Sequence, residues 1–271
     1  MYAVIQSPYR QAEPMTSINS YSVIGIDPGS GKGLQCFSDD GWTTVSPNEA
    51  KHWVHEKVKH GGPLLVTWDA PISFNAQYGL TFRPIERSNS PIQKWLTEQQ
   101  QSNCLAPNAV FVGGFSGLSH WVISCECLGM PFGDKPEGLT IAKSHRDLEN
   151  SQKTKFVIEV HPAVSLAVWW VATCGPGPLP KYKGALKAEE KQKARSKIWD
   201  HLKGKGLVAN LRTPKNDDEL DAWVAWKMGT DFLSEKAYWI GDPIAGGFVL
   251  PVEAERDFNL STQMAEHINN S

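Results

Sequence analysis

The sequence of 271 residues has no apolar run long enough to cross a membrane. A membrane-spanning helix needs about 18 consecutive apolar residues. The longest apolar run here, residues 163–173, has only eleven. The first twenty residues also lack the basic start and the apolar stretch of a secretory signal. These two absences predict a cytoplasmic protein without a membrane partner.

Paired cysteine motifs are missing as well. The five cysteines are an odd number and include no CxxC spacing, which favours reduced thiols over a disulfide framework. His52 and His55 lack the HExxH pattern, so the sequence does not support a zinc site there. Neither disulfides nor zinc are therefore expected to stabilise the fold.

The sequence also has no excess of positive charge. The chain carries 27 basic and 29 acidic residues, a net charge of −2, whereas proteins that coat nucleic acid without specificity are usually more basic. The hydrophobic fraction of 41% and the charged fraction of 21% are typical of a soluble globular protein and exclude general disorder. An enzyme with a local basic face remains compatible with this balance.

The pattern of apolar residues predicts an α/β protein. Short apolar runs bounded by turn residues predict five strands, at residues 21–27, 34–38, 42–46, 64–69 and 155–160. Helix patterns lie at residues 47–60, 118–128, 185–203 and 217–228, and two further helices begin at residues 90 and 162.

Two early hairpins followed by strands and helices predict one mixed sheet flanked by helices. We expect a single domain over residues 21–271, preceded by a polar arm at residues 1–20. Residues 70–154 are predicted to form a helical insertion between the fourth and fifth strands, and residues 247–251 form a last extended piece.

Three of the predicted strands have an acidic residue at or near their end, namely Asp27, Asp69 and Glu159. Acids are rare in strands, and burial of a carboxylate is unfavourable unless it is paired or binds a metal. A further acidic cluster opens the helix at residues 217–228, where Asp218 and Asp221 share a face because they are three residues apart. Carboxylates gathered at one sheet edge suit Mg²⁺ or Mn²⁺, and two such ions about 4 Å apart can promote phosphodiester hydrolysis.

Each acid also has a structural interpretation. Asp27 and Asp69 precede turns and could cap them, and acids in the first turn of a helix complement its dipole. The repetition of acids at three strand ends and one helix start favours a site. His161, two residues after Glu159, could line that site, although a hydrogen-bonded core histidine is the favoured interpretation.

Five segments of the chain resemble a known family in sequence and in order. These are IGIDPGSGKG, VTWDAPIS, FVIEVHPAVS, PKYKGAL and KNDDELDAWVAW, which together span residues 22–251. They are similar to the successive motifs of a family described as RNase H-like nucleases, related in fold to the RuvC resolvases. The resemblance implies an RNase H-like fold and a two-metal carboxylate site.

The resemblance also implies roles for the acids. The first-strand acid, Asp27, would bridge the metal ions. Asp69 would come from the fourth strand, and Asp218 or Asp221 from the last helix. Glu159 on the fifth strand is a feature of this family alone. All five acids are therefore candidate catalytic and metal-binding residues.

Basic residues gather in the second half of the chain. Residues 181–205 hold nine basic and three acidic residues, a local charge of +6 that would attract a phosphate backbone. A solvated helix face is the alternative interpretation. The candidate nucleic-acid contacts are Lys183, Lys187, Lys191 and Arg195, together with Arg83 and Arg87, which could instead neutralise the acid cluster.

The glycine-rich turn GSGKG at residues 29–33 gives a competing hypothesis. It is not a Walker A loop, because that motif needs four residues between the first glycine and the Gly-Lys-Ser/Thr end. An actin-like ATPase or phosphotransferase shares this kind of opening, but it needs a second glycine-rich phosphate turn. A non-catalytic RNase H-like binding module is another alternative. The sequence favours a divalent-metal-dependent nuclease that acts on DNA or RNA.

The metal-site hypothesis makes a geometric prediction. The carboxylates of Asp27, Asp69 and either Asp218 or Asp221 should lie within about 8 Å of one another, the span that such a site requires. Carboxylates at opposite edges of the sheet would contradict it.

Overall fold

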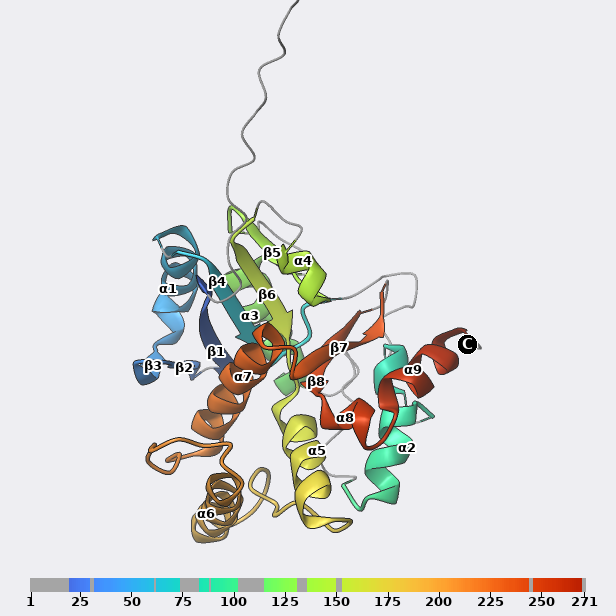
Figure 1. Ribbon diagram of the computed structural model, residues 1–271. Helices are drawn as coiled ribbons and strands as arrows, with labels where there is room; N and C mark the ends of the chain where they lie inside the picture. The colour runs from blue at the N-terminus through green and yellow to red at the C-terminus, as the bar shows by residue number, and fades with distance from the viewer. Residues whose placement is uncertain are drawn as a thin grey trace, which may run out of the picture.

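A computed structural model shows a mixed sheet with helices on both faces (Figure 1). The structure describes residues 20–29, 32–60, 62–73, 83–87, 89–101, 115–130, 136–149, 153–243 and 246–269. The expected polar arm at residues 1–20 lies outside these ranges except for its last residue. No helix in the described ranges is long and apolar enough to cross a membrane.

The central sheet has six strands in the order β3-β2-β1-β4-β6-β5. The strands are β1 (Ser22–Gly29), β2 (Gly33–Ser38), β3 (Gly41–Val45), β4 (Leu64–Trp68), β5 (Leu139–Ile141) and β6 (Lys155–Glu159). The first three pair antiparallel, and β1, β4, β6 and β5 pair parallel. The five predicted strands are confirmed, and the α/β class with them.

The segment at residues 70–154 is not purely helical. It contains the 3-10 turn η3 (Pro84–Glu86), α2 (Pro91–Glu98), α3 (Phe115–Leu128) and α4 (His145–Glu149), and it also contains β5. β5 pairs with β6 at the edge of the sheet. The prediction of a helical insertion between the fourth and fifth strands missed this strand, because three residues carry too little pattern to be recognised.

Helices cover the two faces of the sheet. α1 (Pro47–His60) and α3 pack on one face, in a cluster with alternate strand residues such as Ile24, Ile26 and Val66. α5 (Pro162–Cys174), α6 (Ala188–Gly204) and α7 (Asp217–Leu233) belong to the cluster that contains Val23 and Leu65. This alternation follows from the two-residue period of a strand, which sends successive side chains to opposite faces.

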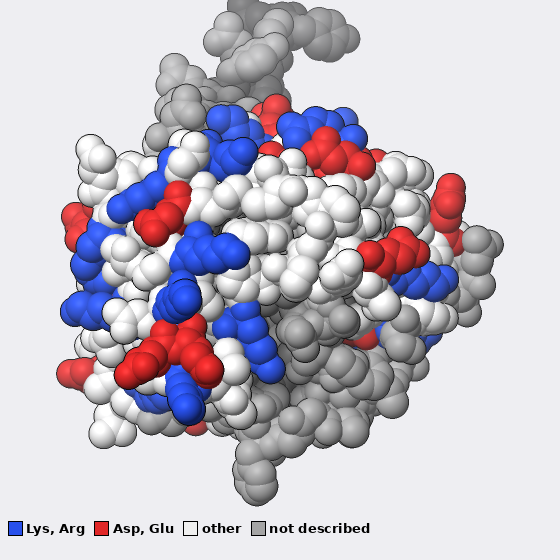
Figure 2. Space-filling model, turned by 90° about the horizontal axis from the view of Figure 1, so that it is seen from below, with Lys and Arg blue, Asp and Glu red and all other residues white. Residues whose placement is uncertain are grey.

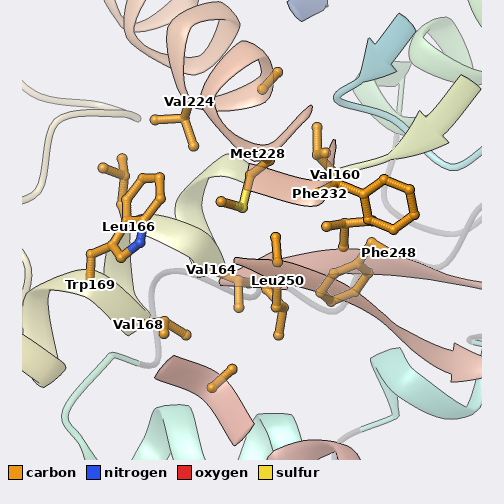
Figure 3. Packing of buried hydrophobic residues seen from close by; sticks show 14 of the residues in the cluster. Val160, Val164, Leu166, Val168, Trp169, Val224, Met228, Phe232, Phe248 and Leu250 are labelled. Atoms are coloured by element: carbon orange, nitrogen blue, oxygen red, sulfur yellow. The ribbon is translucent and has the colours of Figure 1, made fainter. Parts of the chain in front are cut away.

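A hairpin of β7 (Ala237–Asp242) and β8 (Gly246–Pro251) extends the fold beyond β6. β8 is the extended piece expected at residues 247–251, whereas β7 was not predicted. Val249 of β8 pairs with Val160 just after β6, and Phe248 and Leu250 pack with Val164 and Met228 in the same core (Figure 3). Two helices, α8 (Glu253–Arg256) and α9 (Leu260–Asn269), follow the hairpin, so α7 is not the last helix of the chain.

Glycines allow α7 to lie directly against β1 and β4. A Cβ atom at Gly25 of β1 would lie 2.2 Å from the Ala222 carbonyl oxygen and from the Trp226 nitrogen. A Cβ atom at Gly229 of α7 would lie 2.5 Å from side-chain atoms of Thr67 and Val23. The backbone of α7 can approach the sheet this closely only because both side chains are absent. The approach brings the first turns of α7 to the ends of these strands.

The close approach predicts a large effect of Gly25→Ala. The added methyl group would overlap backbone atoms that cannot rotate away. We therefore expect the free energy of unfolding to fall by about 3 kcal/mol, the upper end of the range that is typical of overpacked cores. Gly204→Ala is the control, because Gly204 of α6 has nothing within 4 Å of an added Cβ. Urea unfolding of both variants measures this, and equal stability of the two would contradict the packing of α7 on β1.

Candidate metal centre

Two aspartates lie side by side just after the last paired residues of β1 and β4. Ile26 and Trp68 are partners in the parallel register of these strands, and the Asp69 amide donates a 2.9 Å hydrogen bond to the Ile26 carbonyl oxygen. Asp27 and Asp69 therefore occupy the next register position together. Both side chains point to the face that α7 covers, because Val23, Gly25 and Leu65 on the same alternation pack there.

The third aspartate, Asp221, comes from a firmly held part of α7. The Asn216 side chain caps the helix by accepting a 2.7 Å hydrogen bond from the Glu219 amide. Arg212 donates to both carboxylate oxygens of Glu219, at 2.6 and 2.9 Å, and lies 4.1 Å above the ring of Trp42. The Trp42 indole in turn donates a 2.8 Å hydrogen bond to the Glu219 carbonyl oxygen. These contacts fix the helix start half a turn before Asp221.

The carboxylates of Asp27, Asp69 and Asp221 form one group, which we call the aspartate triad. One carboxylate oxygen from each residue lies within 4.8 Å of those of the other two. Asp27 and Asp221 are 8% and 1% exposed. The geometric prediction from the sequence is thus confirmed, with Asp221 rather than Asp218 as the helix residue. The triad lines a cavity of about 250 Å³.

Burial and mutual repulsion raise the pKa of all three carboxyl groups. For Asp27, burial is the largest cause, followed by the charge of Asp69. Burial raises the pKa of Asp69 from 3.8 to about 8, although Lys183 opposes this increase. Burial also raises the pKa of Asp221, again against the effect of Lys183. A raised pKa makes the charged form of a carboxyl group less favourable, unless a cation stabilises that form.

Lys183 contacts the aspartate triad and does not belong to an exposed basic surface. Its ammonium group contacts Oδ2 of Asp221, and the hydroxyl group of the preceding Tyr182 donates a 2.8 Å hydrogen bond to Oδ1. Burial lowers the pKa of Lys183, but the neighbouring carboxylates, Asp221 first, raise it well above its ordinary value. Although 43% of the side chain is exposed, its charged end is therefore engaged by the acids.

Glu159 lies at the cavity wall but outside the triad. It is the register partner of Trp68, one position before Asp69, so strand alternation turns its side chain to the other face. There Arg83 pairs with both of its carboxylate oxygens, at 2.6 and 2.8 Å, and the Ile72 amide donates a 3.0 Å hydrogen bond. Arg83 also pairs with Glu86. Arg83 therefore neutralises buried acids, one of the two roles expected for it.

Asp218 also lies beside the triad without joining it. Its Oδ2 atom is 3.3 Å from the ammonium group of Lys32, and both residues line the cavity. Lys32 belongs to the glycine-rich turn GSGKG, the candidate phosphate loop of the sequence. Asp217 lines the same cavity wall. The cavity thus has Lys32, Lys183 and Arg83 around its acids.

Two histidines complete the described lining of the cavity. His161 precedes α5, and burial lowers its pKa to about 3. Its buried Nδ1 atom has no hydrogen-bond partner in the described part of the chain, although the sequence favours a hydrogen-bonded core histidine. His120 of α3 also lines the cavity, and burial lowers its pKa too. Sequence reasoning missed His120, because no motif or spacing connects it to the acids.

The other predicted phosphate contacts lie outside the cavity. Arg195 is buried, and its guanidinium group donates a 2.8 Å hydrogen bond to the Lys215 carbonyl oxygen. Lys187 is exposed at the start of α6 and Lys191 is half-exposed, whereas Arg87 is half-buried near η3. Seen from below, Lys and Arg side chains gather on the half of the surface that carries α6, with acidic side chains among them (Figure 2).

Comparison with known proteins gives no match: no family model, no curated protein and no solved structure is significantly similar to this chain. The geometry of the triad, its burial and its charged neighbours are therefore the observations from which a function can be inferred.

The raised pKa of Asp69 predicts how stability depends on pH without metal. The folded protein keeps this proton up to about pH 8, whereas the unfolded chain loses it near pH 4. The free energy of unfolding should therefore fall as pH rises between these values. One group contributes a slope of up to about 1.4 kcal/mol per pH unit.

Asp69→Asn should flatten this slope, and urea unfolding in chelator from pH 5 to pH 8 measures it. Asp200→Asn is the control, because Asp200 is exposed on α6, away from the cavity. If wild type and Asp69→Asn lose stability equally with pH, Asp69 does not carry the extra proton.

Proposed function

We propose that the protein is a divalent-metal-dependent nuclease with an RNase H-like fold. The observation that carries this proposal is the aspartate triad, in which buried carboxylates from β1, from the end of β4 and from α7 converge in one cavity. The sequence resemblance implies acids from the first strand, the fourth strand and the last helix, although α7 is followed by the short helices α8 and α9. Asp27, Asp69 and Asp221 stand at these places, which supports the proposal.

The residues of the triad fit a hard divalent cation such as Mg²⁺ or Mn²⁺. Such ions prefer carboxylate oxygens, and the triad offers three. Asp27 is only 8% exposed, yet its carboxylate has no hydrogen bond or ion pair within the described part of the chain. A buried carboxylate without a partner is unfavourable unless a cation binds it. A bound ion would lower the pKa of a water ligand and stabilise negative charge on the phosphate.

The other cavity residues suit a phosphodiester substrate. Lys32 is 74% exposed at the cavity wall, where its ammonium group can attract a phosphate group. His161 is neutral at pH 7, because its pKa is lowered to about 3, so its imidazole can form hydrogen bonds without adding charge. His120, also with a lowered pKa, can accept a proton from a water molecule at the site. The exposed lysines of α6 would hold the more distant parts of a nucleic acid.

Cleavage of labelled oligonucleotides tests this function. Wild type should cleave at least one of single-stranded, duplex or branched DNA or RNA with Mg²⁺ or Mn²⁺, and not with chelator. Asp27→Asn should reduce the rate at least about 100-fold, since changes in residues that merely support metal ligands already reduce activity 10- to 100-fold. Asp200→Asn should cleave like wild type.

Three results would contradict the proposal. Metal-independent binding of nucleic acid without cleavage would indicate a non-catalytic module. Hydrolysis of ATP without any cleavage of nucleic acid would indicate the actin-like alternative. Equal rates for Asp27→Asn and wild type would place the activity outside the triad.

The lysines of α6 give an independent prediction about substrate binding. Replacing Lys187, Lys191 and Lys193 with alanine should weaken oligonucleotide binding and reduce the slope of log K against log salt by about 0.9 for each lost phosphate contact. Replacing Lys51, Lys57 and Lys59 of α1 removes the same charge from the other face of the sheet and should leave the slope unchanged.

Both triple variants are compared with wild type over a salt series in Ca²⁺, which slows cleavage while binding is measured. Identical slopes for the α6 variant and wild type would show that these lysines form only a solvated helix face.

A further inference from the structure

The position of Lys183 leads to a specific inference about the metal centre, which rests on the proposed function. We infer that the site takes one divalent cation rather than two, and that the ammonium group of Lys183 supplies the second positive charge. The contact between Lys183 and Asp221 carries this inference, together with the ion pairs that occupy the other acids of the cavity.

The spacing of the triad suits a single ion. Oxygen ligands lie about 2.1 Å from Mg²⁺, so two on opposite sides of one ion are about 4.2 Å apart. The three carboxylate oxygens of the triad lie within 4.8 Å of one another, which is close to this spread. A pair of ions about 4 Å apart needs further carboxylates around the second ion.

Of the four remaining acids of the cavity, all but Asp217 are paired with a cation. Glu159 and Glu86 both bind Arg83, and Asp218 contacts Lys32. No other group of three acids, histidines or cysteines close enough to hold an ion occurs among the described residues. Asp217 alone cannot hold an ion, so a second ion would have to displace Lys183 from Asp221 or break one of these ion pairs.

The segment around Lys183 is built to hold the ammonium group in place. Tyr182 is 4% exposed, and its hydroxyl group binds the same carboxylate that Lys183 contacts. Upstream, the buried Leu179 donates a 2.9 Å amide hydrogen bond to the Gln101 side chain. Each oxygen of Asp221 keeps a second lone pair for an ion, so Lys183 and one cation can share this carboxylate.

The charges of the site agree with this arrangement. Three ionised carboxylates are balanced by one divalent cation and one ammonium group. Two divalent cations together with Lys183 would leave two surplus positive charges before a substrate arrives. Lys183 would then face the phosphate from beside the ion and stabilise negative charge that develops on its oxygens. Lys183 is thus assigned to the reaction centre, not to the more distant nucleic-acid surface.

Manganese binding tests the inference without any measurement of activity. Calorimetric titration should give one Mn²⁺ per chain for wild type, and the electron paramagnetic resonance spectrum should be that of an isolated ion. Lys183→Ala frees an oxygen of Asp221 and removes the competing charge. This variant should bind two Mn²⁺ per chain, with the exchange-coupled spectrum of ions about 4 Å apart. Lys181→Ala removes an exposed lysine from the same segment and should behave like wild type.

The outcomes are distinct. A coupled pair of ions in wild type would overturn the inference while leaving the nuclease proposal intact, and this result does not depend on whether any variant folds. One ion in both wild type and a folded Lys183→Ala would show that Lys183 does not occupy the second position. No Mn²⁺ bound by wild type would remove the metal centre, and the proposed function with it.

Discussion

Repulsion among three carboxylates in a largely buried cavity is the constraint on which the rest of this structure depends. Separate segments bring the oxygens of Asp27, Asp69 and Asp221 within 4.8 Å, although their proximity is unfavourable without a cation. The packing of α7 on β1 must therefore hold them together. Gly25 and Gly229 permit this packing, since any larger side chain would hold the helix away from the strands. The favourable burial of the surrounding core stabilises a site that is itself unfavourable.

The cations around the cavity divide the acids into two kinds. Arg83 and Lys32 pair with acids at the wall and make them part of the structure. Lys183 pairs with Asp221 of the triad, whereas Asp27 has no hydrogen bond or ion pair to any residue that the structure describes. This distribution distinguishes carboxylates that only line the cavity from carboxylates that remain open to an ion. The pairing of the wall acids also explains why a cavity so rich in acids is compatible with a stable fold.

The sequence alone predicts the central strands and the acids near their ends, because buried strands and acids at their ends are strong local patterns. It does not predict which acids meet. Glu159 and Asp69 both end strands, but one register position sends Glu159 to the other face, and strand boundaries read from sequence are uncertain by more than that. The locations of Lys183 and Arg195 are equally unpredictable from the sequence. Both belong to a basic stretch, yet tertiary contacts place one in the triad and bury the other.

The central claim is that the aspartate triad is a metal centre, and the structure of a crystal soaked in Mn²⁺ tests it most directly. The account predicts an anomalous difference peak between the carboxylates of Asp27, Asp69 and Asp221, with Lys183 still in contact with Asp221. An empty triad at a saturating concentration of Mn²⁺ would contradict it. The three carboxylates would then form a cluster that does not bind metal.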